Sequence, residues 1–255
     1  MKSIFSIIIP LILLFSISSV SAQVPRFSYE KFRNANGDSL QYRFLYPDNS
    51  INQKYPLVIF LHGSGENGTD NEAQLKWGVM NFASEENMKM HPAFVIAPQC
   101  PPDMEWANAN YAKDGKVMNI DKPSKTGAIV MELIKDLSKR FPVDTNRIYI
   151  TGLSSGGHGT FDLIIRYPNT FAAAVPVCGS GDISKASSIA HIPIWIFHGA
   201  EDPSVNPEYS RKMVEALAKA GGFPGYTQYP AIGHFCWLAA YSDPMMMNWL
   251  FSQHK

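Results

Sequence analysis

Short apolar runs recur along this chain, and segments of a different periodicity separate them. Five runs are apolar at nearly every position, which is typical of strands buried on both faces of a parallel sheet; these runs are residues 56–63, 93–99, 147–152, 172–179 and 192–199. The run 40–46 alternates apolar and polar residues and predicts an outer antiparallel strand. The more polar run 225–230 predicts a last strand.

Helical periodicity fills the intervals between these runs. Apolar residues return at helical spacing in the segments 127–141, 156–168, 206–222 and 243–253. The first of these carries its basic residues late, and the third has proline near its start and glycine at its end, as helix termini favour. Because strands and helices alternate, the sequence predicts an α/β fold in a single domain, with a mostly parallel central sheet flanked by helices.

Residues 100–126 have no clean period and contain prolines, a glycine and several aromatic residues. A loop of this length usually has a function or is disordered. It follows the predicted strand 93–99, and open α/β sheets place their sites at the carboxyl ends of such strands. We therefore expect an insertion at the rim of a site, carrying Trp106 and Tyr111. The alternative is a structural surface excursion.

The first 22 residues have the layout of a secretory signal peptide: Lys2, an apolar core at 4–15 and small residues up to Ala22. We expect cleavage after Ala22, a domain at 23–255, and a secreted or periplasmic location. A membrane anchor is the alternative. The apolar core is shorter than the roughly 20 residues that a span needs, so we expect no stable membrane span after cleavage.

The formal net charge is zero, with 22 basic and 22 acidic residues. Such a balance offers no electrostatic attraction to nucleic acid or to an anionic membrane. The histidines and cysteines lack the paired spacing of metal sites, and no phosphate-binding glycine motif is present. The sequence therefore predicts no metal, no cofactor and no nucleic-acid partner, and it carries no signal for the oligomeric state.

Three cysteines, Cys100, Cys178 and Cys236, allow one disulfide at most. A domain of this size does not need such a cross-link. We expect all three to be small apolar residues, with a Cys100–Cys236 bridge as the alternative.

The run Gly152-Leu153-Ser154-Ser155-Gly156 fits the pattern G-x-S-x-G, between a predicted strand and a predicted helix. This context is that of a nucleophile elbow, a sharp turn that exposes the central serine. The glycines allow the sharp turn and keep Cβ atoms away from neighbouring elements. We expect Ser154 to supply a nucleophilic hydroxyl.

A serine hydroxyl needs a histidine base held by a carboxylate, and with this elbow the order along the chain is serine, acid, histidine. His234 follows the last predicted strand in a glycine-containing loop and is the expected base. Asp202 follows the strand 192–199 and is the expected acid. Asp182 is the runner-up acid, although a turn or helix cap is the more natural role for it. We expect His158, in the helix after the elbow, to point away from the serine.

The oxyanion formed during acyl transfer needs backbone N–H donors. One should be the N–H of Ser155 at the start of the helix, where donors point outward. The second should come from the loop after an earlier central strand, and we assign it to Ser64, with Gly63 and Gly65 shaping the loop. We expect His62 to pack and orient this loop. The alternative is a plain glycine-rich turn.

Six segments, LHGSGENG, APQCP, TGLSSGGHGT, VPVCGSGD, IPIWIFHGAEDPSV and IGHFCW, resemble a family of secreted or periplasmic α/β-hydrolases. Its members are of predicted-peptidase, dienelactone-hydrolase-like or phospholipase/carboxylesterase type, and are similar to feruloyl and polyhydroxybutyrate-depolymerase-type esterases. The resemblance covers most of residues 27–253. It implies an α/β-hydrolase fold with nucleophile Ser154, acid Asp202 and base His234. One departure is Ser155, where methionine or glutamine is common in relatives; only its backbone N–H is needed.

The leading functional hypothesis is therefore a metal-independent serine hydrolase acting on small-molecule or carbohydrate esters. Trp106, Tyr111 and Trp237 favour sugars or aromatic acyl groups, such as acetyl or feruloyl esters of plant polysaccharides, although such aromatic residues are as often simply the wall of a site. Two alternatives stay open: a serine peptidase of the prolyl-oligopeptidase type, and a binding protein on a hydrolase scaffold.

Overall fold

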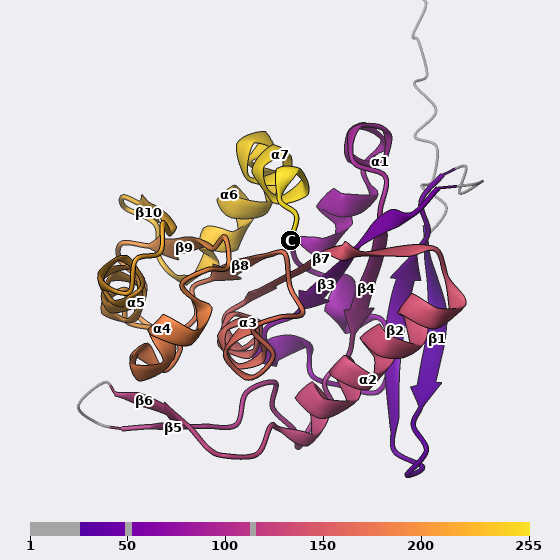
Figure 1. Cartoon of the computed structure of the whole chain (residues 1–255), viewed down its shortest axis with the longest axis horizontal. Helices are drawn as coiled ribbons and strands as arrows, with labels where there is room; N and C mark the ends of the chain where they lie inside the picture. Colours follow the sequence, from indigo (N-terminus) through magenta and orange to yellow (C-terminus); the bar gives the residue numbers. More distant parts are fainter. Residues whose placement is uncertain (1–25, 49–52, 113–115) are drawn as a thin grey trace, which may run out of the picture.

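The computed structural model describes residues 26–48, 53–112 and 116–255 (Figure 1). The proposed signal peptide, residues 1–22, lies outside these ranges and stays a prediction. In the described part, an eight-stranded sheet has the order β1-β2-β4-β3-β7-β8-β9-β10. The strands are β1 Phe27–Arg33, β2 Ser39–Leu45, β3 Tyr55–Leu61, β4 Phe94–Pro98, β7 Val143–Leu153, β8 Ala173–Val177, β9 Trp195–Gly199 and β10 Gly225–Tyr229.

Strand β2 is antiparallel to both of its neighbours, and the pairs from β4 to β10 are parallel. This confirms the mostly parallel sheet and the antiparallel strand predicted at 40–46, but that strand is not the outermost one, because β1 pairs along its other side. All seven predicted strands are present. Strand β1 was not predicted. It pairs with β2 along the sheet edge, and after the buried Phe27 its side chains alternate between half-buried and exposed positions.

Helices cover both faces of the sheet (Figure 1). They are α1 Glu85–Met90, α2 Lys125–Arg140, α3 Ser155–Arg166, α4 Ala186–Ile189, α5 Glu208–Lys219, α6 Trp237–Ser242 and α7 Pro244–Ser252. Buried side chains of α2, α3, α4 and α5 form one core with Leu57 and Ile59 of β3, while α1, α6 and α7 form the other with Val58 and Phe60. The near-continuous apolar runs therefore contribute side chains to both cores.

The three cysteines are buried and free. Cys100 belongs to the core beneath α2, whereas Cys178 and Cys236 belong to the core on the opposite face of the sheet. The alternative of a Cys100–Cys236 bridge is therefore wrong, because the sheet separates the two thiols. The expectation of small apolar residues is confirmed.

Residues 100–126 leave the carboxyl end of β4 and form a two-stranded antiparallel arm, β5 Ala109–Tyr111 and β6 Val117–Asn119, apart from the main sheet (Figure 1). Helix α3 holds this arm in place. The Arg166 guanidinium donates to the carbonyl oxygens of Asn108 and Ile120 at 3.0 and 2.7 Å, and pairs with Asp162 at 2.7 Å. The segment that was predicted only as an aperiodic rim thus contains a pair of antiparallel strands tied to α3.

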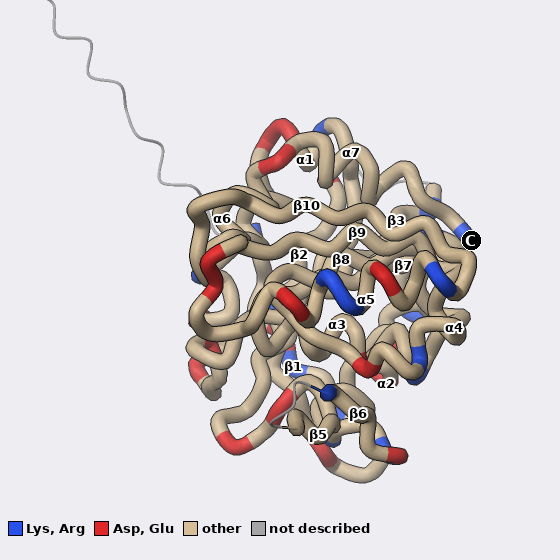
Figure 2. The backbone as a smooth tube through the Cα atoms, turned by 90° about the vertical axis from the view of Figure 1, so that its left-hand side faces the viewer, with Lys and Arg blue, Asp and Glu red and all other residues tan. Residues whose placement is uncertain are grey.

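Charged residues of both signs are mixed over the fold, as the alternation of acidic and basic positions along α5 illustrates (Figure 2). None of the helices in the described ranges has the length and apolarity that a membrane crossing requires.

Candidate active site

Ser154 occupies the sharp turn between β7 and α3. Its backbone has φ 55° and ψ −118°, a conformation that residues other than glycine rarely adopt. A Cβ atom on Gly156 would overlap the carbonyl oxygen of Leu61, and one on Gly152 would overlap the carbonyl of Gly156. Only glycine fits on either side of the serine, so the spacing of the motif follows from how closely β3, β7 and α3 approach each other.

The structure brings Ser154, Asp202 and His234 together at the carboxyl ends of β7, β9 and β10. The Ser154 hydroxyl oxygen lies 2.9 Å from Nε2 of His234, and Nδ1 of His234 lies 2.7 Å from Oδ2 of Asp202. A carboxylate can only accept, so Nδ1 carries the ring hydrogen and Nε2 is left to accept from the serine hydroxyl. The geometry can therefore pass a proton from the hydroxyl to the ring.

Asp202 has a second set of donors. Its Oδ1 accepts from the backbone N–H groups of Ser204 and Val205 at 2.8 and 2.9 Å. Burial acts to raise the pKa of Asp202, but the hydrogen bonds from His234, Val205 and Ser204 outweigh it and hold this pKa below its ordinary value. Asp202 is therefore ionised at neutral pH. The adjacent Glu201 is exposed, as expected of a side chain that faces the other way.

Ser64 and Ser155 each begin a helical turn, Ser64–Glu66 and α3 respectively. The backbone N–H of a first helical residue has no acceptor within its own helix, and at α3 the helix dipole adds an attraction for negative charge. The two amides assigned to the oxyanion therefore have the freedom to bind an external oxygen.

His62 locks the loop that carries Ser64. Its Nδ1–H donates to the carbonyl oxygen of Gly63 at 2.6 Å, and its Nε2 accepts from the backbone N–H of Cys100 at 2.9 Å. Burial lowers the pKa of His62 to about 4, so the ring is neutral, as this pair of bonds requires. The His62 carbonyl in turn accepts from the Trp106 indole N–H at 3.0 Å. His62 packs and orients the loop, as predicted.

A hollow of about 570 Å³ adjoins the two amides, and its lining includes Ser64, Ser155, Trp106, Tyr111 and His158. The prediction that the 100–126 segment forms a rim agrees with this position. His158, predicted to point away from Ser154, is among the lining residues of this hollow, which its sequence position did not indicate. Its direction relative to the Ser154 hydroxyl stays a prediction.

The three aromatic residues expected at the substrate lie in different settings. Trp106 is 1% exposed and Tyr111 is 46% exposed, and both line the hollow. Trp237 is buried outside this lining and packs edge-on against His234, with ring centroids 5.1 Å apart. Of the three, Tyr111 has the most surface to offer a ligand, whereas Trp237 is placed to hold the histidine ring.

A sequence model of the phospholipase/carboxylesterase family matches residues 48–240, about three quarters of the chain. The chain belongs to this family. A solved structure described as a thermostable esterase superposes with a TM-score of 0.84 at 40% identity, over 90% of this chain and 64% of that one. This confirms the α/β-hydrolase fold that the resemblance implied.

Two curated relatives are larger proteins. A poly(3-hydroxyalkanoate) depolymerase C from Paucimonas lemoignei is 24% identical over 84% of this chain and 55% of its own length. An endo-1,4-beta-xylanase/feruloyl esterase from Xylanibacter ruminicola is 29% identical over 67% of this chain and 23% of its own length. This chain, a member of the phospholipase/carboxylesterase family, thus spans about half or less of the length of these relatives. Its membership places it among carboxylesterase-type hydrolases, as predicted.

His198 is a buried partner of the acid that sequence reasoning did not single out. Its Nε2 lies 2.9 Å from the carbonyl oxygen of Val205 and 3.3 Å from Oδ2 of Asp202, and its Nδ1 lies 2.7 Å from the hydroxyl of Ser210. Both neighbours of Nε2 are acceptors, so Nε2 carries the hydrogen and Nδ1 accepts from Ser210. Burial lowers the pKa of His198. The signal in the sequence is its place four residues before Asp202.

Asp182, the runner-up acid, caps a short helical turn. Its Oδ1 accepts from the backbone N–H and the hydroxyl of Ser184, and its Oδ2 accepts from the backbone N–H of Asn119 in β6. The capping role expected for it is confirmed, and it also fastens the arm beside the hollow.

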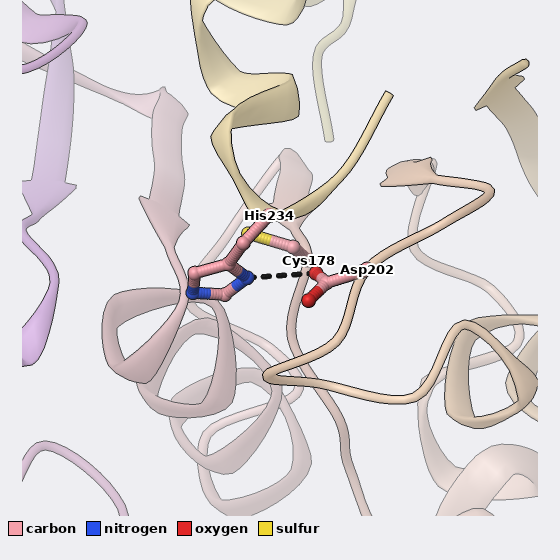
Figure 3. A group of neighbouring side chains, drawn as sticks. All are labelled: Cys178, Asp202 and His234. Atoms are coloured by element: carbon pink, nitrogen blue, oxygen red, sulfur yellow. Dashed lines mark hydrogen bonds and ion pairs between the residues drawn. The ribbon is translucent and has the colours of Figure 1, made fainter. Parts of the chain in front are cut away.

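Cys178, Asp202 and His234 place one potential metal-ligating atom each within 4.8 Å of one another (Figure 3). Their chemistry favours another use. Burial raises the pKa of the Cys178 thiol well above its usual value, which disfavours the thiolate that a metal would need. Both oxygens of Asp202 already accept hydrogen bonds. The group therefore suits proton transfer, and the predicted absence of a metal stays a prediction.

Proposed function

We propose that this protein is a serine esterase that hydrolyses carboxylic esters through an acyl-enzyme on Ser154. The observation that carries the proposal is the continuous hydrogen-bonded series from the Ser154 hydroxyl through His234 to the ionised Asp202. The family adds support, because its description is phospholipase/carboxylesterase.

In this mechanism the Ser154 oxygen attacks the ester carbonyl carbon while His234 Nε2 takes the hydroxyl proton. The carbonyl oxygen becomes an oxyanion and accepts hydrogen bonds from the N–H groups of Ser64 and Ser155. Each such donor contributes about 2.7–4 kcal/mol to lowering the barrier. Asp202 stabilises the imidazolium that forms at His234.

Collapse of the tetrahedral intermediate breaks the bond to the leaving alkoxide, which takes the proton from His234 Nε2. Water then attacks the acyl-enzyme, with His234 removing a proton from the water. The second collapse releases the carboxylic acid and returns the proton to Ser154. Every proton that His234 takes is given back within the cycle, so no cofactor is required.

The substrates we propose are acetyl or feruloyl esters carried by carbohydrates, and the cell compartment we propose is outside the cytoplasm. The substrate proposal is supported by the relative described as an endo-1,4-beta-xylanase/feruloyl esterase and by the exposed ring of Tyr111 at the hollow. The proposal of export rests on residues 1–22. Cell fractionation followed by sequencing of the N-terminus tests it, and a protein found only in the cytoplasm with Met1 retained would refute it.

The test of activity compares Ser154→Ala and Asp202→Asn with the parent on 4-nitrophenyl acetate, methyl ferulate and a peptide 4-nitroanilide. We expect Ser154→Ala to lose ester hydrolysis and labelling by a fluorophosphonate probe. We expect Asp202→Asn to lower kcat on the order of 10⁴-fold, because the neutral amide no longer fixes the ring tautomer. Glu201→Gln, the same change one residue earlier on an exposed side chain, is the matched control and should keep parental kcat/KM.

Three outcomes would contradict the proposal. If Ser154→Ala hydrolysed the esters at the parental rate, Ser154 could not be the nucleophile. A parent protein that cleaves only the peptide anilide would favour the serine-peptidase alternative. A parent that neither turns over any substrate nor reacts with the fluorophosphonate would favour the binding-protein alternative.

A further inference from the structure

His158 lies one helical turn beyond the proposed nucleophile. Its backbone N–H donates to the carbonyl oxygen of Ser154 at 3.0 Å, the i to i+4 relation of neighbours along a helix face. Its ring lines the same hollow as Ser64 and Ser155, whose amides are the proposed oxyanion donors. A group bound against His158 therefore shares this hollow with the residues proposed to hold the oxyanion.

The contacts of His158 fix which ring nitrogen carries hydrogen. Nδ1 lies 2.8 Å from the backbone nitrogen of Ser180 and 3.0 Å from its hydroxyl oxygen. A backbone N–H can only donate, so Nδ1 accepts and the hydrogen of the neutral ring is on Nε2. Burial lowers the pKa of His158 to about 4, so the ring stays neutral near pH 7. The ring edge bearing Nε2–H faces away from Ser180, and no described residue accepts from it.

The rest of the hollow carries acceptors and an aromatic ring. Asp103 and Glu105 lie in its lining, which contains no lysine or arginine among the described residues. The ring of Tyr111 packs on that of His158 at 5.4 Å between centroids. Burial raises the pKa of Tyr111, so its phenol stays protonated. The fixed Nε2–H donor of His158 and the two carboxylates suit a neutral oxygen-bearing group beside His158 and oppose a carboxylate or phosphate there.

We propose that His158 is a specificity-determining residue, whose Nε2–H binds a hydroxyl, ether or carbonyl oxygen on the part of the ester that occupies this hollow. The carboxylates of Asp103 and Glu105 disfavour esters bearing a negative charge there. This inference rests on the proposed esterase function and adds to it the chemistry that the hollow selects. Within a family described as phospholipase/carboxylesterase, it favours neutral, oxygen-rich esters over anionic ones.

The test uses pairs of esters that differ only by an oxygen in place of a methylene. For the acyl side these are 4-nitrophenyl methoxyacetate and 4-nitrophenyl butyrate, and for the alcohol side 2-methoxyethyl acetate and butyl acetate. The kcat/KM ratio of each pair is compared between the parent, His158→Phe and His158→Gln. Intrinsic reactivity cancels in this comparison, because it is the same for every variant.

We expect one pair to respond, which also tells whether the hollow holds the acyl or the alcohol part. In that pair His158→Phe should lower the oxygen-to-methylene ratio about ten-fold, the value of one good hydrogen bond. His158→Gln supplies an amide donor and should keep the ratio within about three-fold of the parent. If His158→Phe and His158→Gln shifted the ratio equally, His158 would have a structural role and the proposal would be overturned. Ratios that neither variant changes would also overturn it.

The charge selection is tested with 4-nitrophenyl hydrogen succinate. We expect Asp103→Asn combined with Glu105→Gln to raise kcat/KM for this anionic ester about two- to five-fold relative to the butyrate, the modest effect of exposed charges. No relative gain would refute this part. Ser154→Ala separates the two levels of inference: if it abolishes all hydrolysis while the ratios are insensitive to His158, the esterase function stands and the specificity role falls.

Discussion

The stability of the fold should fall in mild acid because His62 is buried in its neutral form. The ring is 1% exposed, and burial lowers its pKa from 6.5 to about 4. Between these values the unfolded chain binds a proton that the folded chain does not, so stability falls as the pH drops. The contribution is complete above pH 6.5 and is lost progressively toward pH 4.

The size of the loss follows from linkage. At pH 5, a shift of this size makes His62 favour the unfolded state by about 2 kcal/mol relative to pH 8, rising to about 3 kcal/mol below pH 4. Burial also lowers the pKa values of His158 and His198, so the parent should lose more than His62 alone accounts for. Since domains are stable by only about 5–15 kcal/mol, the loss is readily measured.

The assay is urea unfolding at pH 8 and pH 5 for the parent, His62→Gln and His254→Gln. A glutamine can still donate to Gly63 and accept from Cys100 but cannot be protonated. We expect His62→Gln to be less stable than the parent at pH 8, yet to lose about 2 kcal/mol less between pH 8 and pH 5. His254 is exposed near the end of the chain, so its variant should show the full parental loss. Equal losses in His62→Gln and the parent would refute the reasoning.

Two further predictions concern packing. Gly156→Ala should destabilise the fold by at least about 1–3 kcal/mol in urea unfolding, because its Cβ would overlap the Leu61 carbonyl. In the control Gly65→Ala the added Cβ has no neighbour within 4 Å, so this variant should be nearly neutral. Equal stabilities of the two variants would show that the elbow has more room than the structure indicates. Titration with a thiol reagent should find three thiols per chain in denaturant and only slow reaction in the native protein, because all three cysteines are free and buried; a single reactive thiol in denaturant would indicate a disulfide.

The central strands could be predicted because each is buried on both faces and must therefore be apolar at nearly every position. Strand β1 gives a weaker pattern, since it lies at the sheet edge and carries charged residues on its exposed side. Strands β5 and β6 are three residues each and have no measurable period. Arg166 donates to the arm and Asp182 accepts from it, and a local sequence pattern cannot reveal these hydrogen bonds because both residues are distant in the sequence.

Part of the candidate site could likewise be predicted from the sequence, and part could not. Ser154, Asp202 and His234 could be predicted because each follows a recognisable strand, and parallel strands bring their carboxyl ends to one edge. The orientation of His158 could not, because Ser180 fixes it from the loop after another strand. Trp237 illustrates the converse. It lies outside the lining of the hollow and packs against His234, and aromatic composition alone does not distinguish such packing from substrate contact.

The four histidines in and around the site serve two different purposes. His62, His158 and His198 are held neutral by burial, and each has a nitrogen that accepts from a neighbouring donor. His234 instead joins the ionised Asp202 carboxylate to the hydroxyl of Ser154, the proposed nucleophile. The neutral rings of His62, His158 and His198 therefore act as fixed hydrogen-bonding groups, whereas His234 is the ring placed to exchange a proton with the proposed nucleophile.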